Sequence, residues 1–106
     1  MKTIKKVPIT PIFIEYMPDV FEDGMLYISK KYTTAIHLCL CGCGEQVVTP
    51  LDKIITETET IVSGKPPGDW LLTEKNGRVS ITPSIGCYSF PCKSHYIITN
   101  NIANFV

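Results

Sequence analysis

The distribution of hydrophobic and polar positions along the chain predicts short β-strands separated by turns. Aromatic and β-branched residues gather in short runs, and most of these runs stop near Pro, Gly or Asn, as strands bounded by turn residues do. The runs cover residues 12–17, 25–29, 33–40, 45–48, 70–73, 78–82, 95–99 and 102–106. Helix signals are poor throughout, so we expect a mainly-β fold with little helix.

Two of the turns predict hairpins. Lys75-Asn76-Gly77 separates the runs at 70–73 and 78–82, and Asn100-Asn101 separates the last two runs of the chain. Asn and Gly accept the positive φ angles of tight hairpin turns, so each pair of runs is expected to form adjacent antiparallel strands.

The segment 52–63 is ambiguous. Its first apolar residues have a spacing that could begin a short helix, whereas the alternation of Thr and Glu over 56–60 fits an exposed strand or a loop equally well. Both interpretations stay open. The Gly- and Pro-rich residues 64–68 then break the chain.

Composition and charge narrow the functional classes. The chain has 106 residues, of which 44% are hydrophobic and 19% are charged, as in an ordinary globular domain. Ten Lys and Arg residues balance ten Asp and Glu, whereas proteins that neutralise nucleic-acid phosphates usually have a basic excess. We therefore expect one domain over residues 1–106 and disfavour nucleic-acid binding.

The cysteine content indicates a metal. The sequence has no apolar stretch of the roughly 20 residues that a transmembrane helix needs and no secretory signal, so a cytoplasmic location is expected. Thiols stay reduced in that compartment. The five cysteines are an odd number and are clustered, which favours metal binding over disulfides.

The candidate ligands form two clusters. The members of the first alternate with apolar or small residues, which places them on one side of an extended chain; they are His37, Cys39, Cys41 and Cys43. The second cluster contains Cys92 and His95, three positions apart. Two ligands from each of two distant segments are typical of a zinc ribbon, in which the metal crosslinks hairpins with too small a core of their own.

The sequence offers more ligands than one zinc ion needs. The first choice is Cys41, Cys43, Cys92 and His95, and Cys39 could replace either of the first two. The predicted architecture is a small zinc-ribbon-like β-hairpin scaffold, joined by one ion between its middle and its C-terminal quarter.

Three further residues have simpler interpretations. His37 is expected to cap or pair within the sheet more readily than to bind metal. Cys87 is expected to be a spare core or surface thiol. Ser94 is expected to hydrogen-bond to backbone or sulfur, and we assign it no catalytic role.

Three further motifs stand out: residues 35–44 with the CGCG element, the PSIG element at 83–86, and residues 90–96 with the pattern PCxSHY. Together they resemble a small bacterial and phage zinc-binding domain family of unknown function. Members of that family occur beside ThiF-like activating enzymes and ubiquitin-conjugating-like proteins. The resemblance runs from about Phe13 to Phe105. It implies a metal-binding set of Cys39, Cys41, Cys43, Cys92 and His95.

The segment between Pro50 and Trp70 looks longer than the family's usual connection, so residues 51–68 could hold an inserted loop. Cys87 stands where the family more often has a polar residue, and no family role is carried onto it.

Three functions follow as hypotheses. The first is a zinc-stabilised interaction or adaptor module that binds a protein partner, such as a component of a bacterial ubiquitin-like conjugation or defence system. The second is a zinc-dependent, peptidase-like hydrolase with Glu45 as general base and His37 as the next candidate. The third is a cysteine nucleophile, for which Cys87 is the candidate outside the cluster. Oligomeric state is left open.

Overall fold

The computed structural model describes residues 5–63, 70–86 and 93–106. Within these residues it contains ten strands and no helix, and therefore no helix that is long and apolar enough to cross a membrane. The strands are β1 (Lys6–Pro8), β2 (Thr10–Phe13), β3 (Met25–Ser29), β4 (Thr34–Leu38), β5 (Gln46–Ile55), β6 (Thr60–Val62), β7 (Trp70–Lys75), β8 (Arg78–Gly86), β9 (His95–Thr99) and β10 (Ile102–Phe105). The prediction of a small, mainly-β single domain is confirmed.

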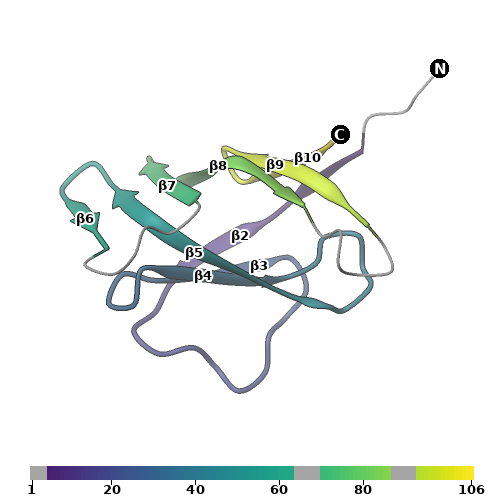
Figure 1. The fold of residues 1–106 in the computed structure, drawn as a ribbon, viewed down its shortest axis with the longest axis horizontal. Helices are drawn as coiled ribbons and strands as arrows, with labels where there is room; N and C mark the ends of the chain where they lie inside the picture. The colour runs from purple at the N-terminus through teal and green to yellow at the C-terminus, as the bar shows by residue number, and fades with distance from the viewer. Residues whose placement is uncertain (1–4, 64–69, 87–92) are drawn as a thin grey trace.

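One sheet bends round until it nearly closes into a barrel. The strand order is β1-β10-β9-β8-β7-β5-β4-β3-β2, with β6 paired to β5. The first and last strands of this order, β1 and β2, are separated in sequence only by Ile9, so they join the two ends of the sheet. In Figure 1, β8, β9 and β10 form a layer above β3, β4 and β5, and β2 crosses between the layers.

The long strand β5 joins the two layers on the other side. Its first half pairs with β4, and from Leu51 onward it pairs in parallel with β7. Inward-facing positions alternate along β4, β5, β8 and β9, as one-sided burial of a sheet requires. The largest fully buried side chains are Tyr96, Leu26, Ile28, Leu51, Ile54, Leu72, Ile81, Ile85, Ile98, His37, Val79 and Thr49.

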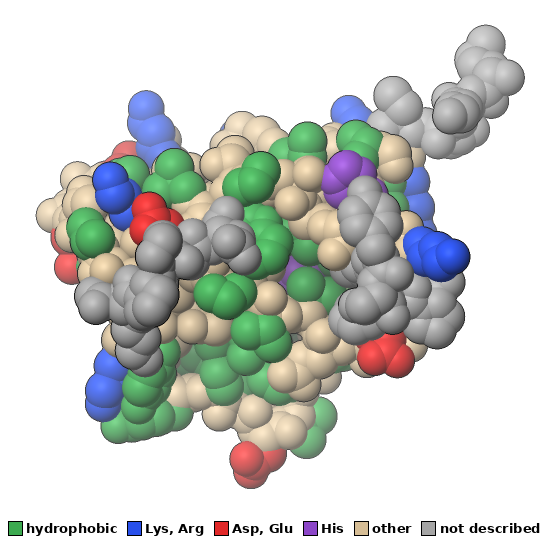
Figure 2. All heavy atoms as spheres, in the orientation of Figure 1, with side chains coloured by type: hydrophobic (Ala, Val, Ile, Leu, Met, Phe, Trp, Pro, Cys, Tyr) green, Lys and Arg blue, Asp and Glu red, His purple; other side chains and the backbone are tan. Residues whose placement is uncertain are grey.

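On the face shown in Figure 2, apolar and charged side chains occupy different parts of the surface. Figure 2 shows hydrophobic side chains reaching the surface over the middle of one face, with most charged side chains nearer its margin. The buried hydrophobic side chains form one cluster with members from strands of both layers, so both layers must be in place to form the core.

Both predicted hairpins are present. Asn76 and Gly77 have φ angles of 54° and 74°, and Asn100 and Asn101 have 48° and 65°. Two consecutive positive φ angles are the mark of a type I′ turn, which matches the twist of the strands it connects. Local turn chemistry therefore determined the β7–β8 and β9–β10 pairings.

The ambiguous segment is a strand, so its helical interpretation is wrong for the described residues 52–63. β5 passes through Pro50 and continues to Ile55, and a tight turn leads to β6, where the Thr56 N–H donates to the Glu59 carbonyl at 2.9 Å. The inserted loop at 51–68 stays a prediction, since residues 64–68 lie outside the described part of the chain.

Candidate functional site

A serine and a histidine meet on neighbouring strands. Ser84 lies on β8 and His95 is the first residue of β9, and Ser84 Oγ is 2.6 Å from His95 Nε2. Both side chains are half-buried, so the pair is held by the protein and still reachable from solvent. A hydroxyl within hydrogen-bond distance of an imidazole nitrogen is the arrangement that activates a serine as a nucleophile.

An irregularity in β8 accompanies this pair. Ile81 pairs with Ile98 and Ile85 pairs with Tyr96, so four positions along β8 correspond to only two along β9. The surplus residues of β8 bulge, and bulges re-aim side chains near active sites. Ser84 lies in this bulge, directly after Pro83, a residue that cannot donate a backbone hydrogen bond to the sheet.

Hydrogen bonds hold the backbone of both residues. The indole Nε1 of Trp70 donates to the Ser84 carbonyl at 3.3 Å. The Val106 N–H donates to the His95 carbonyl at 3.0 Å. Ser84 and His95 are thus attached to separate strands whose relative position is set by the β8–β9 ladder.

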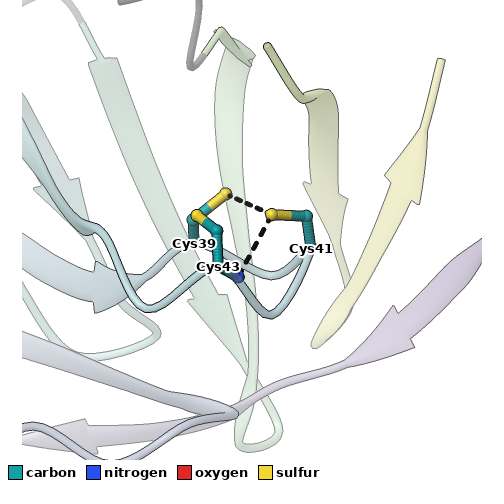
Figure 3. Close-up of side chains that lie close together, drawn as sticks. All are labelled: Cys39, Cys41 and Cys43. Atoms are coloured by element: carbon teal, nitrogen blue, oxygen red, sulfur yellow. Dashed lines mark hydrogen bonds between the residues drawn. The ribbon is translucent and has the colours of Figure 1, made fainter. Parts of the chain in front are cut away.

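Three cysteines form a second cluster at the end of β4. Cys39, Cys41 and Cys43 lie in one tight loop, and their side chains point toward one another (Figure 3). Gly42 and Gly44 have φ angles of 94° and 82°, a region that favours glycine and permits the tight loop.

The loop is closed by backbone hydrogen bonds. The Gly42 N–H donates to the Cys39 carbonyl at 3.1 Å, and the Cys39 N–H donates to the Glu45 carbonyl at 2.7 Å. Cys39 is buried at the base of the loop, whereas Cys43 is exposed at its tip.

The sulfur atoms fit a metal ion. All three lie within 4.8 Å of one another, and the Cys39 and Cys41 sulfurs are 3.5 Å apart. A tetrahedral zinc ion with bonds of about 2.3 Å separates its sulfur ligands by about 3.8 Å. The donor chemistry therefore suits zinc without large rearrangement of the loop.

Hydrogen bonds favour the thiolate form of Cys41. Burial opposes ionisation, but hydrogen bonds from Cys43, Ser94 and Cys39 outweigh it and lower the pKa of the Cys41 thiol. The backbone N–H of Cys43 contributes, with its nitrogen 3.3 Å from Cys41 Sγ. Because metal ligands must be deprotonated, this environment assists metal binding.

The structure divides the ligands predicted from the sequence. It brings together Cys39, Cys41 and Cys43, whereas His95 Nε2 faces Ser84 Oγ and His95 is not a member of the cysteine group. Cys92 and Cys87 lie outside the described residues, so the metal-binding role of Cys92 and the spare role of Cys87 stay predictions.

His37 pairs across the core. It is fully buried on β4, and its Nε2 lies 2.6 Å from the Tyr96 hydroxyl on β9. Burial lowers the pKa of His37 to about 4, so the ring is neutral near pH 7. Its Nδ1 has no hydrogen-bond partner among the described residues. The expectation of pairing, in preference to metal binding, agrees with this contact.

From the sequence, no role was assigned to Ser84, the residue that the structure places beside His95. The signals available were the PSIG element at 83–86, which contains Ser84, and Pro83 itself, which directly follows a strand-like run and indicates a bulge or a strand edge. The partner, His95, was assigned to metal because it follows Cys92 closely.

Comparison with known proteins supplies the family. The family model described as "Bacterial ubiquitination-like system serine protease (BubE)" matches residues 13–106. No curated protein and no solved structure matches the chain. This match confirms the association with bacterial ubiquitin-like systems that the sequence motifs indicated, and because it covers most of the chain, the protein belongs to the BubE family.

Proposed function

We propose that this protein is a serine peptidase of a bacterial ubiquitination-like system, with Ser84 as nucleophile and His95 as general base. The observation that carries the proposal is the 2.6 Å separation of Ser84 Oγ and His95 Nε2. The description of the family as a serine protease supports the same chemistry.

The geometry permits acyl transfer in two steps. Ser84 Oγ attacks the carbonyl carbon of the scissile amide while His95 Nε2 accepts the hydroxyl proton. His95 returns that proton to the leaving amine as the C–N bond breaks, which leaves an acyl ester on Ser84. Water then attacks the ester, His95 accepts a proton from it, and the serine hydroxyl is regenerated.

The substrates we propose are proteins that carry the ubiquitin-like tag of the same system. The family's place in a ubiquitination-like system supports a protein partner. Trimming or removing such a tag is amide hydrolysis, which is the reaction that a serine and a histidine can catalyse. An adaptor role, the first hypothesis from the sequence, stays a prediction that the catalytic test addresses.

We further propose that Cys39, Cys41 and Cys43 bind one zinc ion, with Cys92 as the fourth ligand. The convergence of three thiols in one loop supports this assignment. The ion would supply structural crosslinking, because four protein ligands close a zinc site. His95 is then available for the chemistry at Ser84.

Zinc-dependent hydrolysis with Glu45 as base is the less favoured mechanism. Thiolate ligands donate charge to a metal and make it a weaker Lewis acid, and the family description names a serine protease. Glu45 follows the cysteine loop and is exposed, and its backbone carbonyl closes that loop. We also propose a cytoplasmic location for the protein.

A covalent serine probe tests the catalytic proposal. A fluorophosphonate reacts with an activated serine hydroxyl: the P–O bond forms, fluoride leaves, and the histidine takes the proton. We expect labelling at Ser84, its loss in Ser84→Ala and His95→Ala, and its retention in Ser80→Ala. Cleavage of tagged proteins of the system, measured by mass spectrometry, should likewise be lost in Ser84→Ala and His95→Ala and retained in Ser80→Ala. Equal labelling of wild type and Ser84→Ala would refute the proposal and favour an adaptor.

A further inference from the structure

Two positive side chains lie opposite each other beside the turn between β7 and β8. Lys75 is the last residue of β7, Arg78 is the first residue of β8, and the two are partners in the antiparallel ladder. Like charges directly opposite each other destabilise a sheet. The stability of the hairpin therefore does not explain why two cations occupy these positions.

The described part of the chain leaves both cations without an ion pair. The ion pairs found there involve the lysines of the β3–β4 turn. Glu74, which precedes Lys75, directs its carboxylate to the turn, where Oε2 accepts the Gly77 N–H at 3.0 Å. Lys75 and Arg78 are both exposed, so their charges are accessible to a partner in solution.

The pair borders a hollow in the surface where two hairpin turns meet. The hollow has a volume of about 370 Å³ and is lined by Lys75, Asn76, Arg78 and Asn100. The side-chain amide of Asn101 donates to the Gly77 carbonyl at 3.1 Å and so joins the β9–β10 turn to the β7–β8 turn. Ammonium, guanidinium and amide groups all offer N–H donors, and a guanidinium can bind a carboxylate through two of them. The lining is therefore suited to an anionic group.

The pair lies on the outer face of the sheet, as Ser84 does. Val79 and Ile85 are fully buried on β8 and face the core. Because successive side chains of a strand point to opposite faces, Arg78 before the first and Ser84 before the second face outward. Lys75 shares the face of Arg78, its ladder partner. Figure 1 shows β8 running from this turn toward the start of β9.

The distance from the pair to Ser84 matches a short peptide. Regular strand connects Arg78 to Ile81, and the bulge then compresses the path from Ile81 to Ile85 to two positions of the β9 ladder. At about 3.3 Å per residue, Arg78 and Ser84 are about 15 Å apart, which an extended peptide spans with about four or five residues. The outward side chains between them are short and uncharged, so they leave this path open.

We propose that Lys75 and Arg78 form an exosite that binds an acidic segment of the protein substrate. The inference rests on the proposed function of Ser84 and His95. The segment contributes aspartate or glutamate carboxylates at about four or five residues from the scissile bond. These carboxylates accept hydrogen bonds from the guanidinium and the ammonium group, and their charge offsets the repulsion between the two cations.

An acidic peptide fits this site better than a nucleic acid does. Proteins that bind nucleic acids neutralise many phosphates and usually have a basic excess. Here the two cations stand together in a chain whose formal net charge is zero. The surface beside them also leads to the serine and histidine proposed to cleave an amide bond.

Two reactive probes test the exosite without knowledge of the natural substrate. Each carries a fluorophosphonate, a spacer of about four or five residues, and a tail of either glutamates or glutamines. The two probes differ only in the charge of the tail, so the ratio of their labelling rates measures recognition of that charge. The ratio is measured for wild type and for the double substitution Lys75→Gln/Arg78→Gln.

Lys30→Gln/Lys31→Gln is the matched control. It removes the same charge from a turn in the other layer, where Lys30 is already paired with Glu59 at 2.7 Å and Lys31 with Glu15 at 3.4 Å. A change that followed from net charge alone would therefore appear in both double variants.

We expect wild type to react about 10-fold faster with the glutamate probe than with the glutamine probe at low ionic strength, because two exposed ion pairs form. Added salt should lower this ratio. The ratio should fall to near one in Lys75→Gln/Arg78→Gln and stay at the wild-type value in Lys30→Gln/Lys31→Gln. A ratio near one in wild type, or an equal ratio in all three proteins, overturns the inference.

A binding measurement separates this inference from the proposed function. The glutamate tail without the fluorophosphonate, and separately a single-stranded oligonucleotide, are titrated into wild type while backbone amide resonances are followed by NMR. If neither probe labels Ser84, the catalytic proposal fails and this titration alone decides the binding of acidic segments. Shifts around Lys75, Arg78 and Asn100 that are lost in Lys75→Gln/Arg78→Gln support it. Absent shifts at this turn, or tighter binding of the oligonucleotide there, overturn it.

Discussion

The Tyr96 hydroxyl and His37 Nε2 lie 2.6 Å apart in the core, where a hydrogen bond joins β9 in one layer to β4 in the other. The rings meet edge to face, with centroids 5.9 Å apart and an interplanar angle of 67°. Tyr96 is also the residue that follows His95. We therefore expect the contact between the layers to stabilise the fold and to hold in place the strand that carries the candidate base.

Tyr96→Phe should destabilise the protein while preserving the packing of the ring. The substitution leaves His37 Nε2 buried without its hydroxyl partner, and an unsatisfied buried polar group costs about 1–3 kcal/mol. Urea unfolding would measure the loss. Tyr32→Phe is the matched control, because Tyr32 is exposed and its substitution should change the free energy of unfolding by less than about 0.5 kcal/mol. Equal effects of the two substitutions would contradict this prediction.

Stability should fall in acid because His37 resists protonation in the folded state. The folded pKa of about 4 lies below the ordinary value of 6.5, so between these pH values the unfolded chain binds more protons than the folded one. The contribution is fully favourable above about pH 6.5 and is lost as pH falls toward about 4, a total of about 3 kcal/mol.

His37→Gln provides the comparison for this pH dependence, since glutamine cannot titrate there. The free energy of unfolding of wild type and variant would be measured by urea titration at several pH values from 7 to about 4. The difference between the two proteins should shrink as pH falls. A difference that is constant over this range would show that His37 does not titrate as its burial implies.

The features that could be predicted from the sequence are those formed by residues close together along the chain. The two type I′ hairpins follow from Asn76-Gly77 and Asn100-Asn101, whose local conformational preferences decide the pairing. The cysteine loop is equally local, since three thiols at alternating positions need only a tight turn to converge.

The serine–histidine pair could not be predicted in the same way. Ser84 and His95 are brought together by the register of β8 on β9, and that register is shifted by a bulge. Alternation alone does not reveal how many residues a bulge adds. The His37–Tyr96 contact depends on the packing of two layers and is equally invisible in local patterns. His95 also had a competing interpretation as a zinc ligand, because Cys92 precedes it at ligand spacing.

Removing the metal should destabilise the fold. We expect about one zinc ion per purified chain, lost in Cys41→Ser together with several kcal/mol of folding free energy, because binding energy at such a site is folding energy. Metal analysis and thermal unfolding would measure both. Cys87→Ser is the control, since the sequence predicts that Cys87 is a spare thiol, and it should retain zinc. A wild-type protein that is folded and free of metal would contradict the zinc proposal.

If Ser84 is the proposed nucleophile, Trp70→Phe should slow its labelling more than the effect of the substitution on stability explains. The indole Nε1 donates to the Ser84 carbonyl at 3.3 Å, and phenylalanine retains an aromatic ring but has no donor. The bulge that carries Ser84 then loses a restraint, so fluorophosphonate labelling should slow by several-fold. Glu74→Ala is the matched control: Glu74 lies at the far end of β7, where Oε2 accepts the Gly77 N–H at 3.0 Å. It should lower the unfolding temperature and leave the labelling rate unchanged. If both variants lower the labelling rate in proportion to lost stability, Trp70 supports the fold and not the orientation of Ser84.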